Sequence, residues 1–235
     1  MVDVHHGSSG QPERVSRFEI LETLGEGAMG VVYRARDTML QRDVALKLIK
    51  PQLAQEPRNR SRFLRECRAA ATINHPGVAT IYEAGETENG RLFLASELVE
   101  GETLKDRIGR GALPPDEVID IGIQLGDALE AAHEKGAIHR DIKPSNLMIT
   151  ADGRLKVLDF GLARLVAVDD SDADDVERTA DMTQEGAVVG TPAYMSPEQA
   201  SGMKVDSRTD IFSAGCVLYE LVTGNSPFQS GSVPE

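Results

Sequence analysis

The chain has 235 residues, 40% of them hydrophobic and 27% charged, which is long enough to bury a sizeable core without disulfides or metals. Its 25 Lys and Arg against 38 Asp and Glu give a formal net charge of −13, which argues against binding to nucleic acid or to an anionic membrane surface. No apolar run reaches the roughly 18 residues of a membrane-spanning helix, and the two cysteines stand far apart. These features predict a soluble globular protein of a reducing compartment.

The first hundred residues are predicted to be mostly sheet. Residues 1–17 are small and polar and predict a flexible lead-in. Apolar residues alternate through residues 18–50 on both sides of a glycine-rich turn, a pattern typical of successive antiparallel strands. The spacing becomes helical over residues 58–73 and strand-like again up to residue 99. We therefore expect a sheet-rich lobe over residues 18–99 with one helix.

The second half, residues 100–235, is predicted to be mainly helical. A helix is expected to begin at Pro114–Pro115 and to end near Gly136, because proline suits the first helical turn and glycine the position past the last one. Two short strand-like pieces follow, and a second long helix is predicted over about residues 210–223. The chain therefore reads as a small sheet lobe joined to a larger helical lobe near residue 100.

A glycine-rich stretch, Gly-Glu-Gly-Ala-Met-Gly, covers residues 25–30. Glycine allows tight turns and a close approach of backbone N–H groups to a phosphate. The same spacing occurs in dinucleotide-binding folds, where the glycines open a helix. Here Val31-Val32-Tyr33 continues as a strand, which favours a strand–loop–strand cover over phosphates rather than a dinucleotide site.

Lys47 ends an apolar run, Val44-Ala45-Leu46, on the next predicted strand. A lysine in such a place is either an edge residue that points into water or, beside a phosphate-covering loop, a partner for the phosphates. Glu66, in the following helical stretch, is either the residue that holds this lysine or an ordinary exposed glutamate.

Three further motifs follow in the second half. Residues 138–146 read Ile-His-Arg-Asp-Ile-Lys-Pro-Ser-Asn, residues 158–161 read Leu-Asp-Phe-Gly, and residues 190–198 read Gly-Thr-Pro-Ala-Tyr-Met-Ser-Pro-Glu. Together with the glycine-rich stretch and the lysine strand, these motifs resemble those of the eukaryotic-type protein kinase family, and more narrowly of its bacterial Ser/Thr members. The resemblance covers residues 18 to about 229, with the five motifs in the order of the family.

The resemblance implies an α+β, bilobal protein-kinase-like fold. Its small antiparallel sheet lobe with one helix is expected over residues 18–99, and its larger, mainly helical lobe over residues 100–235. The family continues with several more helices past the position of the helix at 210–223, and one of them carries an arginine that pairs with the counterpart of Glu198. We find no such arginine here, so we expect a partial large lobe with some apolar surface left exposed.

The resemblance also assigns roles in phosphoryl transfer. The loop at residues 25–30 covers the phosphates of ATP, and Lys47 contacts the α- and β-phosphates and pairs with Glu66. Asp141 orients the substrate hydroxyl and accepts its proton. Lys143 steadies the transferred phosphate and indicates Ser/Thr rather than Tyr specificity. The implied activity is an ATP- and Mg²⁺-dependent protein serine/threonine kinase.

The expected cofactors are ATP and Mg²⁺, with Asn146 and Asp159 as the hard oxygen ligands of the metal. Adenine is expected to bond to the Glu97 carbonyl and the Val99 N–H. Ser96 stands where the family carries a bulkier residue, which predicts a deep back pocket. The residues expected around ATP are Gly25, Glu26, Gly27, Ala28, Met29, Gly30, Val32, Ala45, Lys47, Glu97, Val99 and Met148.

Regulation is expected to involve the segment between residues 165 and 190, where crowded aspartates predict a loop. Thr179 and Thr183 in this loop are candidate autophosphorylation sites, with unmodified loop hydroxyls as the alternative. By the resemblance, Arg140 pairs with a phosphorylated loop. Thr191 belongs to the substrate platform and supports Ser/Thr specificity.

Other family positions have structural roles by the same resemblance. His139 and Phe160 are expected to pack between the lobes, and Asp210 is expected to accept backbone N–H groups of the turn at residues 139–141. Cys67 and Cys216 lie on apolar helix faces, which predicts inert thiols rather than redox switches.

The expected partners are proteins with Ser or Thr hydroxyls, and autophosphorylation between chains implies transient self-association. A kinase-fold binding module without turnover is the alternative, although Lys47, Asp141 and Asp159 are all present. A small-molecule phosphotransferase is a further alternative, which the substrate-platform motif at residues 190–198 argues against. A cytoplasmic location is expected for this chain, and a longer membrane-anchored parent stays open.

Overall fold

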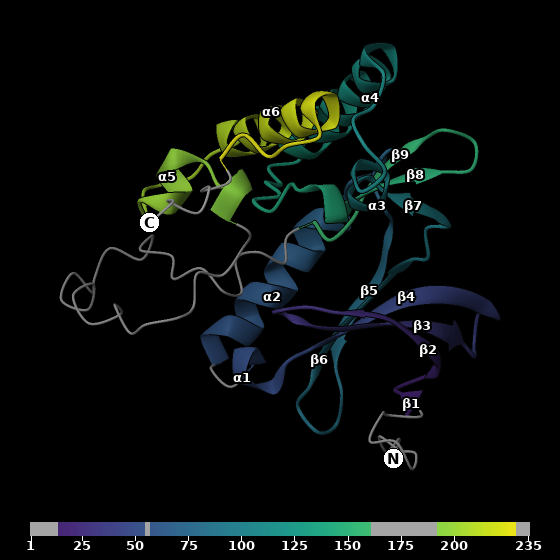
Figure 1. The fold of residues 1–235 in the computed structure, drawn as a ribbon. Helices are drawn as coiled ribbons and strands as arrows, with labels where there is room; N and C mark the ends of the chain where they lie inside the picture. Colours follow the sequence, from purple (N-terminus) through teal and green to yellow (C-terminus); the bar gives the residue numbers. More distant parts are fainter. Residues whose placement is uncertain (1–13, 55–56, 161–191, 229–235) are drawn as a thin grey trace, which may run out of the picture.

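The computed structural model describes residues 14–54, 57–160 and 192–228. Figure 1 shows a twisted sheet with one long helix beside it, and a second region in which two long helices lie next to each other. This is the predicted arrangement of a sheet lobe and a helical lobe. The exact division at residues 17 and 99 stays a prediction.

The first lobe is a six-stranded antiparallel sheet whose strand order is β1-β2-β3-β4-β6-β5. Strands β2, β3 and β4 are consecutive hairpin neighbours, as their alternating apolar residues predict. The strands are β1 (Arg14–Val15), β2 (Phe18–Glu26), β3 (Gly30–Asp37), β4 (Arg42–Ile49), β5 (Ile81–Glu86) and β6 (Leu92–Glu97).

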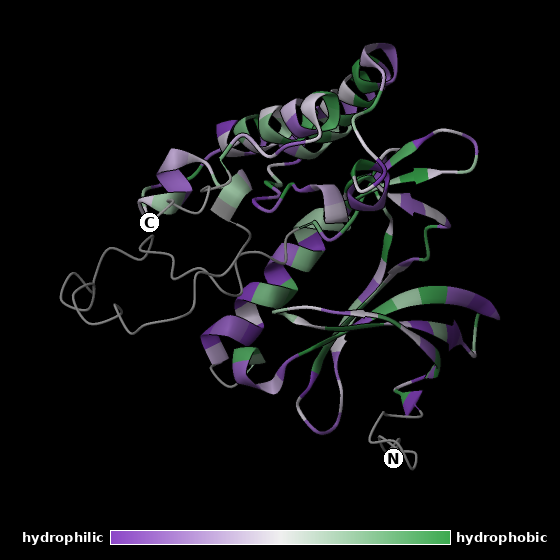
Figure 2. Cartoon of the chain, in the orientation of Figure 1, coloured by the Kyte–Doolittle hydropathy of each residue, from purple (hydrophilic) through white to green (hydrophobic). Residues whose placement is uncertain are grey.

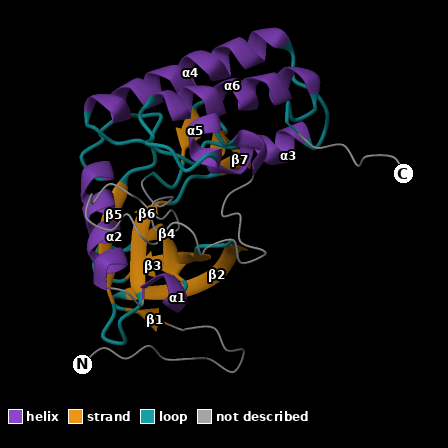
Figure 3. Ribbon diagram, turned by 90° about the vertical axis from the view of Figure 1, so that its left-hand side faces the viewer, coloured by secondary structure: helices purple, strands orange, loops and turns teal. Residues whose placement is uncertain are grey.

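Both faces of this sheet bury apolar side chains, because successive strand residues point to opposite sides. Phe93 joins a cluster with Phe18 and Leu46 on one face. Its neighbour Leu94 joins Phe63 and other residues on the face that packs against α2. Helix α2 (Pro57–Ala70) corresponds to the predicted helix at 58–73, and it lies beside the sheet in Figures 1 and 3.

The structure corrects one point about this lobe: a second, one-turn helix α1 (Pro51–Ala54) precedes α2. A single turn is too short to show a helical period in the sequence, so pattern analysis does not detect it.

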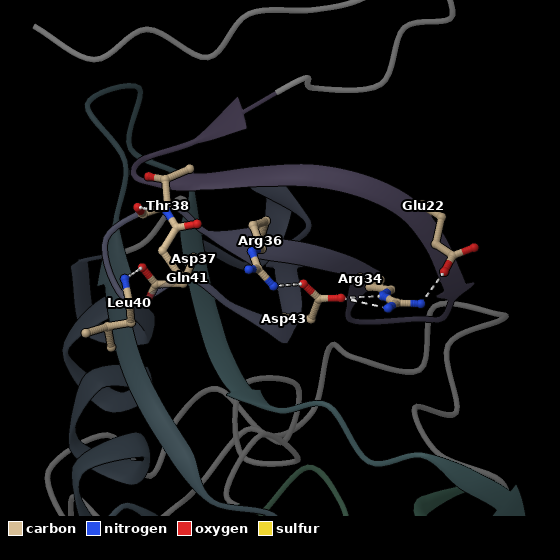
Figure 4. Close-up of polar contacts among 8 residues, drawn as sticks. All are labelled: Glu22, Arg34, Arg36, Asp37, Thr38, Leu40, Gln41 and Asp43. Atoms are coloured by element: carbon tan, nitrogen blue, oxygen red, sulfur yellow. Dashed lines mark hydrogen bonds and ion pairs between the residues drawn. The ribbon is translucent and has the colours of Figure 1, made fainter.

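Polar contacts hold the hairpin between β3 and β4 (Figure 4). In its turn, Leu40 N donates to Asp37 Oδ1 at 3.0 Å. Along the strands, Arg34 Nη2 donates to Asp43 Oδ2 at 2.7 Å, and Arg36 Nη1 donates to Asp43 Oδ1 at 2.8 Å. The hydrogen bonds from Arg36 and Arg34 lower the pKa of Asp43. These pairs fix the register in which β4 meets β3.

The second lobe contains the two long helices α4 and α6 and a small antiparallel sheet of order β7-β8-β9. Short 3₁₀ turns lie at Pro144–Asn146 and Pro192–Tyr194. The elements are β7 (Gly101–Thr103), α3 (Leu104–Ile108), α4 (Pro115–Glu134), β8 (Leu147–Thr150), β9 (Leu155–Val157), α5 (Pro197–Ala200) and α6 (Arg208–Thr223).

The predicted ends of the long helices are close to the observed ones. Gly136 and Gly224 follow α4 and α6 with φ of 72° each, the left-handed conformation that glycine adopts without strain. Helix α6 begins at Arg208, two residues earlier than predicted. The short elements β7, α3 and α5 were not predicted, because each has five residues or fewer.

The core of the second lobe lies between α4 and α6, which run side by side in Figures 1 and 3. Leu125 and Leu129 of α4 pack with Val217 and Leu221 of α6. Figure 2 shows that apolar residues alternate with polar ones along both helices. As expected, some apolar side chains are exposed: Ile211, Tyr219, Val222 and Phe228.

The two lobes are joined by backbone contacts as well as by the connecting chain. Val78, which follows α2, forms a parallel bridge with Val157 of β9. Ala79 N donates to Val157 O at 3.0 Å, and Val157 N donates to Gly77 O at 2.8 Å. No helix in the described ranges is both long and apolar enough to cross a membrane.

Candidate active site

The register of the first sheet brings the expected nucleotide residues to one face. Lys47 pairs with Val32 on β3 and with Leu94 on β6, and Ala45 pairs with Ser96. Paired residues of an antiparallel sheet point to the same side, and Ala45 and Lys47 are two residues apart on β4. The side chains of Val32, Ala45, Lys47 and Ser96 therefore share a face, and their expected contacts with ATP stay predictions.

The glycine-rich stretch connects two strands. Strand β2 ends at Glu26, β3 begins at Gly30, and Gly27 N donates to Gly30 O at 2.9 Å across the turn. The predicted strand–loop–strand form is confirmed, and the dinucleotide alternative, in which the glycines open a helix, is wrong. A Cβ on Gly30 would lie 2.2 Å from Leu48 O, so this position is closed to other residues.

Lys47 and Asp159 meet although they lie on different lobes. Lys47 Nζ donates to Asp159 Oδ2 at 2.7 Å, and the lysine side chain is largely buried. Burial by itself would raise the pKa of Asp159, but the charge and hydrogen bond of Lys47 outweigh this and lower it. Asp159 is therefore held ionised, as a ligand for a cation must be.

Glu66 lies half-buried on α2, and its expected pairing with Lys47 stays a prediction. The charges of Glu66 and Lys47 both act on the thiol of Cys67. Burial first, and then the charge of Glu66, raise the pKa of Cys67, and Lys47 opposes them; the net result is a pKa of about 12. Cys67 and Cys216 are both buried, which supports the prediction that they are inert.

Asp141 lies at the centre of a compact polar cluster. Its Oδ2 accepts hydrogen bonds from Lys143 Nζ at 2.7 Å and from Asn146 Nδ2 at 3.0 Å. Asn146 Nδ2 also donates to Asp141 O at 2.8 Å. Among the described residues these two side chains occupy Oδ2, which leaves Oδ1 available to a substrate hydroxyl.

The backbone is held in an uncommon conformation just before Asp141 and at Asp159. Arg140 and Asp159 have φ of 67° and 61°, values that cost free energy in residues other than glycine and that occur where the surroundings enforce them. Asp210 supplies part of this support. Its Oδ2 accepts from His139 N at 2.8 Å, and its Oδ1 accepts from Arg140 N at 2.7 Å. The predicted role of Asp210 is therefore confirmed.

His139 is fully buried and packs edge-on against Phe160, with ring centroids 4.6 Å apart. Its Nε2 lies 2.7 Å from Leu158 O, and its Nδ1 accepts from Asp141 N at 3.2 Å. A carbonyl oxygen only accepts and an amide N–H only donates, so the imidazole is neutral with its proton on Nε2. His139 and Phe160 thus join the two motifs, and their expected packing between the lobes stays a prediction.

At the connection between the lobes, Lys156 and Thr80 hold Glu97 in a set of contacts that we call the Glu97 clamp. The carboxylate of Glu97 accepts from Lys156 Nζ at 2.7 Å and from Thr80 N at 3.1 Å, and Glu97 N donates to Thr80 O at 2.8 Å. Lys156 lies opposite Met148 on the β8–β9 pair. The expected adenine contacts of Glu97, Val99 and Met148 stay predictions.

The residues expected to hold a divalent metal are neighbours. Leu158 N donates to Asn146 O at 2.9 Å, which sets Asp159 beside Asn146. The Asn146 amide nitrogen faces Asp141, so its oxygen points to the other side. A carboxylate and an amide oxygen are the hard donors that Mg²⁺ prefers. The donor set therefore fits the ion, and its identity as Mg²⁺ stays a prediction.

The segment after residue 191 is attached to α6. Ser213 Oγ donates to Tyr194 O at 2.7 Å, and the Tyr194 hydroxyl donates to Glu220. Burial, together with this hydrogen bond, raises the pKa of Tyr194. The expected sites at Thr179, Thr183 and Thr191 lie outside the described residues and stay predictions.

Three contacts were not predicted from the sequence. Lys156 binds Glu97, His133 Nε2 lies 2.8 Å from Asp210 Oδ2, and Gln199 Nε2 donates to Arg140 O at 2.8 Å. For Gln199 a local signal existed, because Ser-x-x-Gln at a helix start is a capping-box pattern. The structure has this box between Ser196 and Gln199. The other contacts leave no local trace in the sequence.

Comparison with known proteins agrees with this geometry. The family model described as "Protein kinase domain" matches residues 18–234. The solved structure of the PknI kinase domain from Mycobacterium tuberculosis superposes with a TM-score of 0.74 at 27% identity, over 94% of this chain and 80% of that one. The α+β kinase fold is thus shown.

Curated relatives are similar over nearly the whole chain. Serine/threonine-protein kinase PknB of Mycobacterium leprae is 44% identical over 92% of this chain and 34% of its own length. A probable serine/threonine-protein kinase of Streptomyces coelicolor is 43% identical over 94% and 32%. The chain spans about a third of the length of these relatives. It therefore belongs to the protein kinase family, and the relatives that it matches are bacterial serine/threonine-protein kinases.

Proposed function

We propose that this chain transfers the γ-phosphoryl group of ATP to Ser and Thr hydroxyls of proteins, with Mg²⁺ as the metal. The observation that carries the proposal is a pair of polar clusters: Lys47 of the first lobe with Asp159 of the second, and Asp141 with Lys143 and Asn146. The charge of Lys143 also helps to lower the pKa of Asp159. Phosphoryl transfer needs positioning and charge neutralisation more than covalent catalysis, and these clusters supply both.

The residues of the chain divide the work. Asp141 accepts a hydrogen bond from the attacking hydroxyl and takes its proton as the oxygen bonds to the γ-phosphorus. The bond from that phosphorus to the β–γ bridging oxygen breaks, and ADP leaves. Lys143 Nζ lies 2.7 Å from Asp141 Oδ2, which supports a role in sharing its charge with the transferred group. Lys47 neutralises the α- and β-phosphates. Asp159 and Asn146 would hold Mg²⁺, which would supply further charge neutralisation for the phosphates.

Substrates and regulation are part of the proposal. Lys143 and Thr191, together with the relatives' names, support protein Ser/Thr hydroxyls as acceptors. Thr179 and Thr183 are the proposed autophosphorylation sites, which requires transient encounters between chains. Mass spectrometry after incubation with ATP tests this point: phosphate on either threonine supports it, and an active enzyme without phosphate on either rejects it.

The decisive experiment measures phosphate transfer from ATP and Mg²⁺ to a generic protein substrate, beside Asp141→Asn and Lys47→Met. We expect transfer to Ser and Thr by the unaltered chain and loss in both variants. Transfer to small metabolites instead of protein would support a small-molecule phosphotransferase. Binding of ATP without turnover by the folded chain would support a binding module.

A further inference from the structure

The peptide bond between Arg140 and Asp141 is held at both of its polar atoms. Its carbonyl oxygen, Arg140 O, accepts from Gln199 Nε2 at 2.8 Å. Its N–H, on Asp141, donates to His139 Nδ1 at 3.2 Å. The contacts of Asp210 reach the N–H groups of His139 and Arg140 instead. Gln199 is therefore a separate attachment point for this peptide plane.

The orientation of the Gln199 amide follows from its partners. Ser196 N donates to Gln199 Oε1 at 3.1 Å, and Thr209 Oγ1 donates to the same oxygen at 2.8 Å. A backbone N–H only donates, so the oxygen of the amide faces Ser196 and its nitrogen faces the Arg140 carbonyl. Ser196 and Thr209 are fully buried, so the amide is anchored on a rigid support.

The support is formed by the end of the substrate-platform motif and the segment that follows it. Gln199 lies on α5, whose capping box joins it to Ser196, and Thr209 lies at the start of α6. The polar chain from Ser196 through Thr209 and Gln199 thus ends on the peptide that carries Asp141. Arg140, with its φ of 67°, needs such external support to keep this conformation.

We propose that Gln199 is a positioning residue that holds the carboxylate of Asp141 in its working geometry and couples it to α5. The inference rests on the proposed function, since it assigns Asp141 a catalytic role. Gln199 contacts the peptide bond of Asp141 and is not among the residues expected to bind ATP. Its replacement should therefore lower the rate of transfer more than it weakens nucleotide binding.

Gln199→Glu is the sharpest variant, because it keeps the shape and the accepting oxygen but sets a second oxygen against Arg140 O. Two acceptors repel unless the carboxyl is protonated and donates. We expect kcat to fall about tenfold or more at pH 8, the scale of a small displacement near the reacting atoms, with KM for ATP within about twofold of the unaltered value. Lowering the pH restores part of the lost rate relative to the unaltered chain.

Gln199→Met gives the second arm, because it removes the hydrogen bond without adding charge. It is expected to lower kcat without the recovery at low pH. Gln124→Glu is the matched control. Gln124 also joins a helix to backbone groups, with Oε1 accepting from Leu155 N at 2.8 Å, and we expect its kcat to stay unchanged.

Amide hydrogen exchange of the segment 138–146 in the nucleotide-free protein gives a readout without activity. We expect faster exchange in both Gln199 variants, at unchanged global unfolding, and no change in the control. Unaltered kcat and unaltered exchange in both Gln199 variants overturn the inference. If the unaltered chain transfers no phosphate, the proposed function fails, and the exchange experiment still decides whether Gln199 holds the Asp141 peptide.

Discussion

Lys47 Nζ donates to Asp159 Oδ2 at 2.7 Å, across 112 positions of sequence and between two lobes. The contact joins β4 to the segment after β9 and lowers the pKa of Asp159. The same two side chains are the ones expected at the phosphates and at the metal. This pair therefore stabilises the packing of the two lobes with the same charges that are expected to act in phosphoryl transfer.

Replacing Lys47 by Met is expected to change how stability depends on pH. Because the folded-state pKa of Asp159 is lowered, its contribution to stability is present above its unfolded pKa of about 3.9 and is lost as the pH falls through the folded value. The free-energy difference between the two proteins should be largest above about pH 5 and shrink below about pH 4. Denaturant unfolding across this range measures it.

The control for that experiment is Lys50→Met, because Lys50 and Glu26 form a longer and more exposed pair at 3.6 Å. Its pH profile should follow that of the unaltered chain. Parallel profiles for Lys47→Met and the unaltered protein would contradict the link between Lys47 and Asp159.

Asp210→Asn should destabilise the fold and slow the reaction. The buried carboxylate accepts hydrogen bonds from His139 N, Arg140 N and His133 Nε2. In asparagine an NH₂ group replaces one carboxylate oxygen, so at least one of these donors loses its acceptor. A loss of about 2 to 3 kcal/mol is expected, measured by denaturant unfolding. Asp206→Asn is the control, since the exposed pair with Arg208 should contribute little. Equal effects of the two changes would refute the assignment.

The glycines at residues 25–30 should differ in what they tolerate. A Cβ on Gly30 would lie 2.2 Å from Leu48 O, whereas Gly25 and Gly27 have no atom within 4 Å of an added Cβ. Gly30→Ala should lower the melting temperature, and Gly25→Ala and Gly27→Ala should leave it nearly unchanged. Thermal unfolding of the three variants checks this, and a similar loss in all three would be the contrary result.

Lys156→Met should raise KM for ATP while kcat changes less. Lys156 and Thr80 hold the carboxylate of Glu97, whose backbone is expected to bind adenine. Loss of the clamp loosens this connection without touching Asp141. Steady-state kinetics with varied ATP measures the effect, and Lys105→Met on the exposed side of α3 is the control. A fall in kcat at constant KM would contradict this role.

Ser96→Met should reduce the sensitivity of the enzyme to ATP-site inhibitors that carry an enlarged group. Ser96 is half-buried and pairs with Ala45 on the face expected to bind the nucleotide, so we expect a longer side chain to fill the predicted back pocket. An increase in inhibition constant of about tenfold corresponds to roughly 1.4 kcal/mol of lost contact. Unchanged inhibition by the enlarged compound would refute the deep back pocket.

Much of this architecture was predictable because it depends on neighbours in sequence. Alternating apolar residues predicted the β2–β3–β4 meander, and Gly136 and Gly224 marked the ends of α4 and α6. The sequence also showed Asp141 and Asn146 within one short motif, at residues 138–146, and Asp159 within another, at residues 158–161. Strand alternation, helical period and glycine turns are all set within a few residues, so the sequence alone determines them.

Tertiary structure decided which of these groups meet. Lys47 pairs with Asp159 across 112 positions, Lys156 pairs with Glu97 across 59, and Gln199 bonds to the Arg140 carbonyl across another 59. The local sequence around a lysine or a glutamine does not show whether its side chain is solvated or bonded to a residue far away in the chain. Its partner is selected by how the two lobes and α5 pack, because burial removes water as the competing hydrogen-bond partner and leaves only the groups that packing brings within reach.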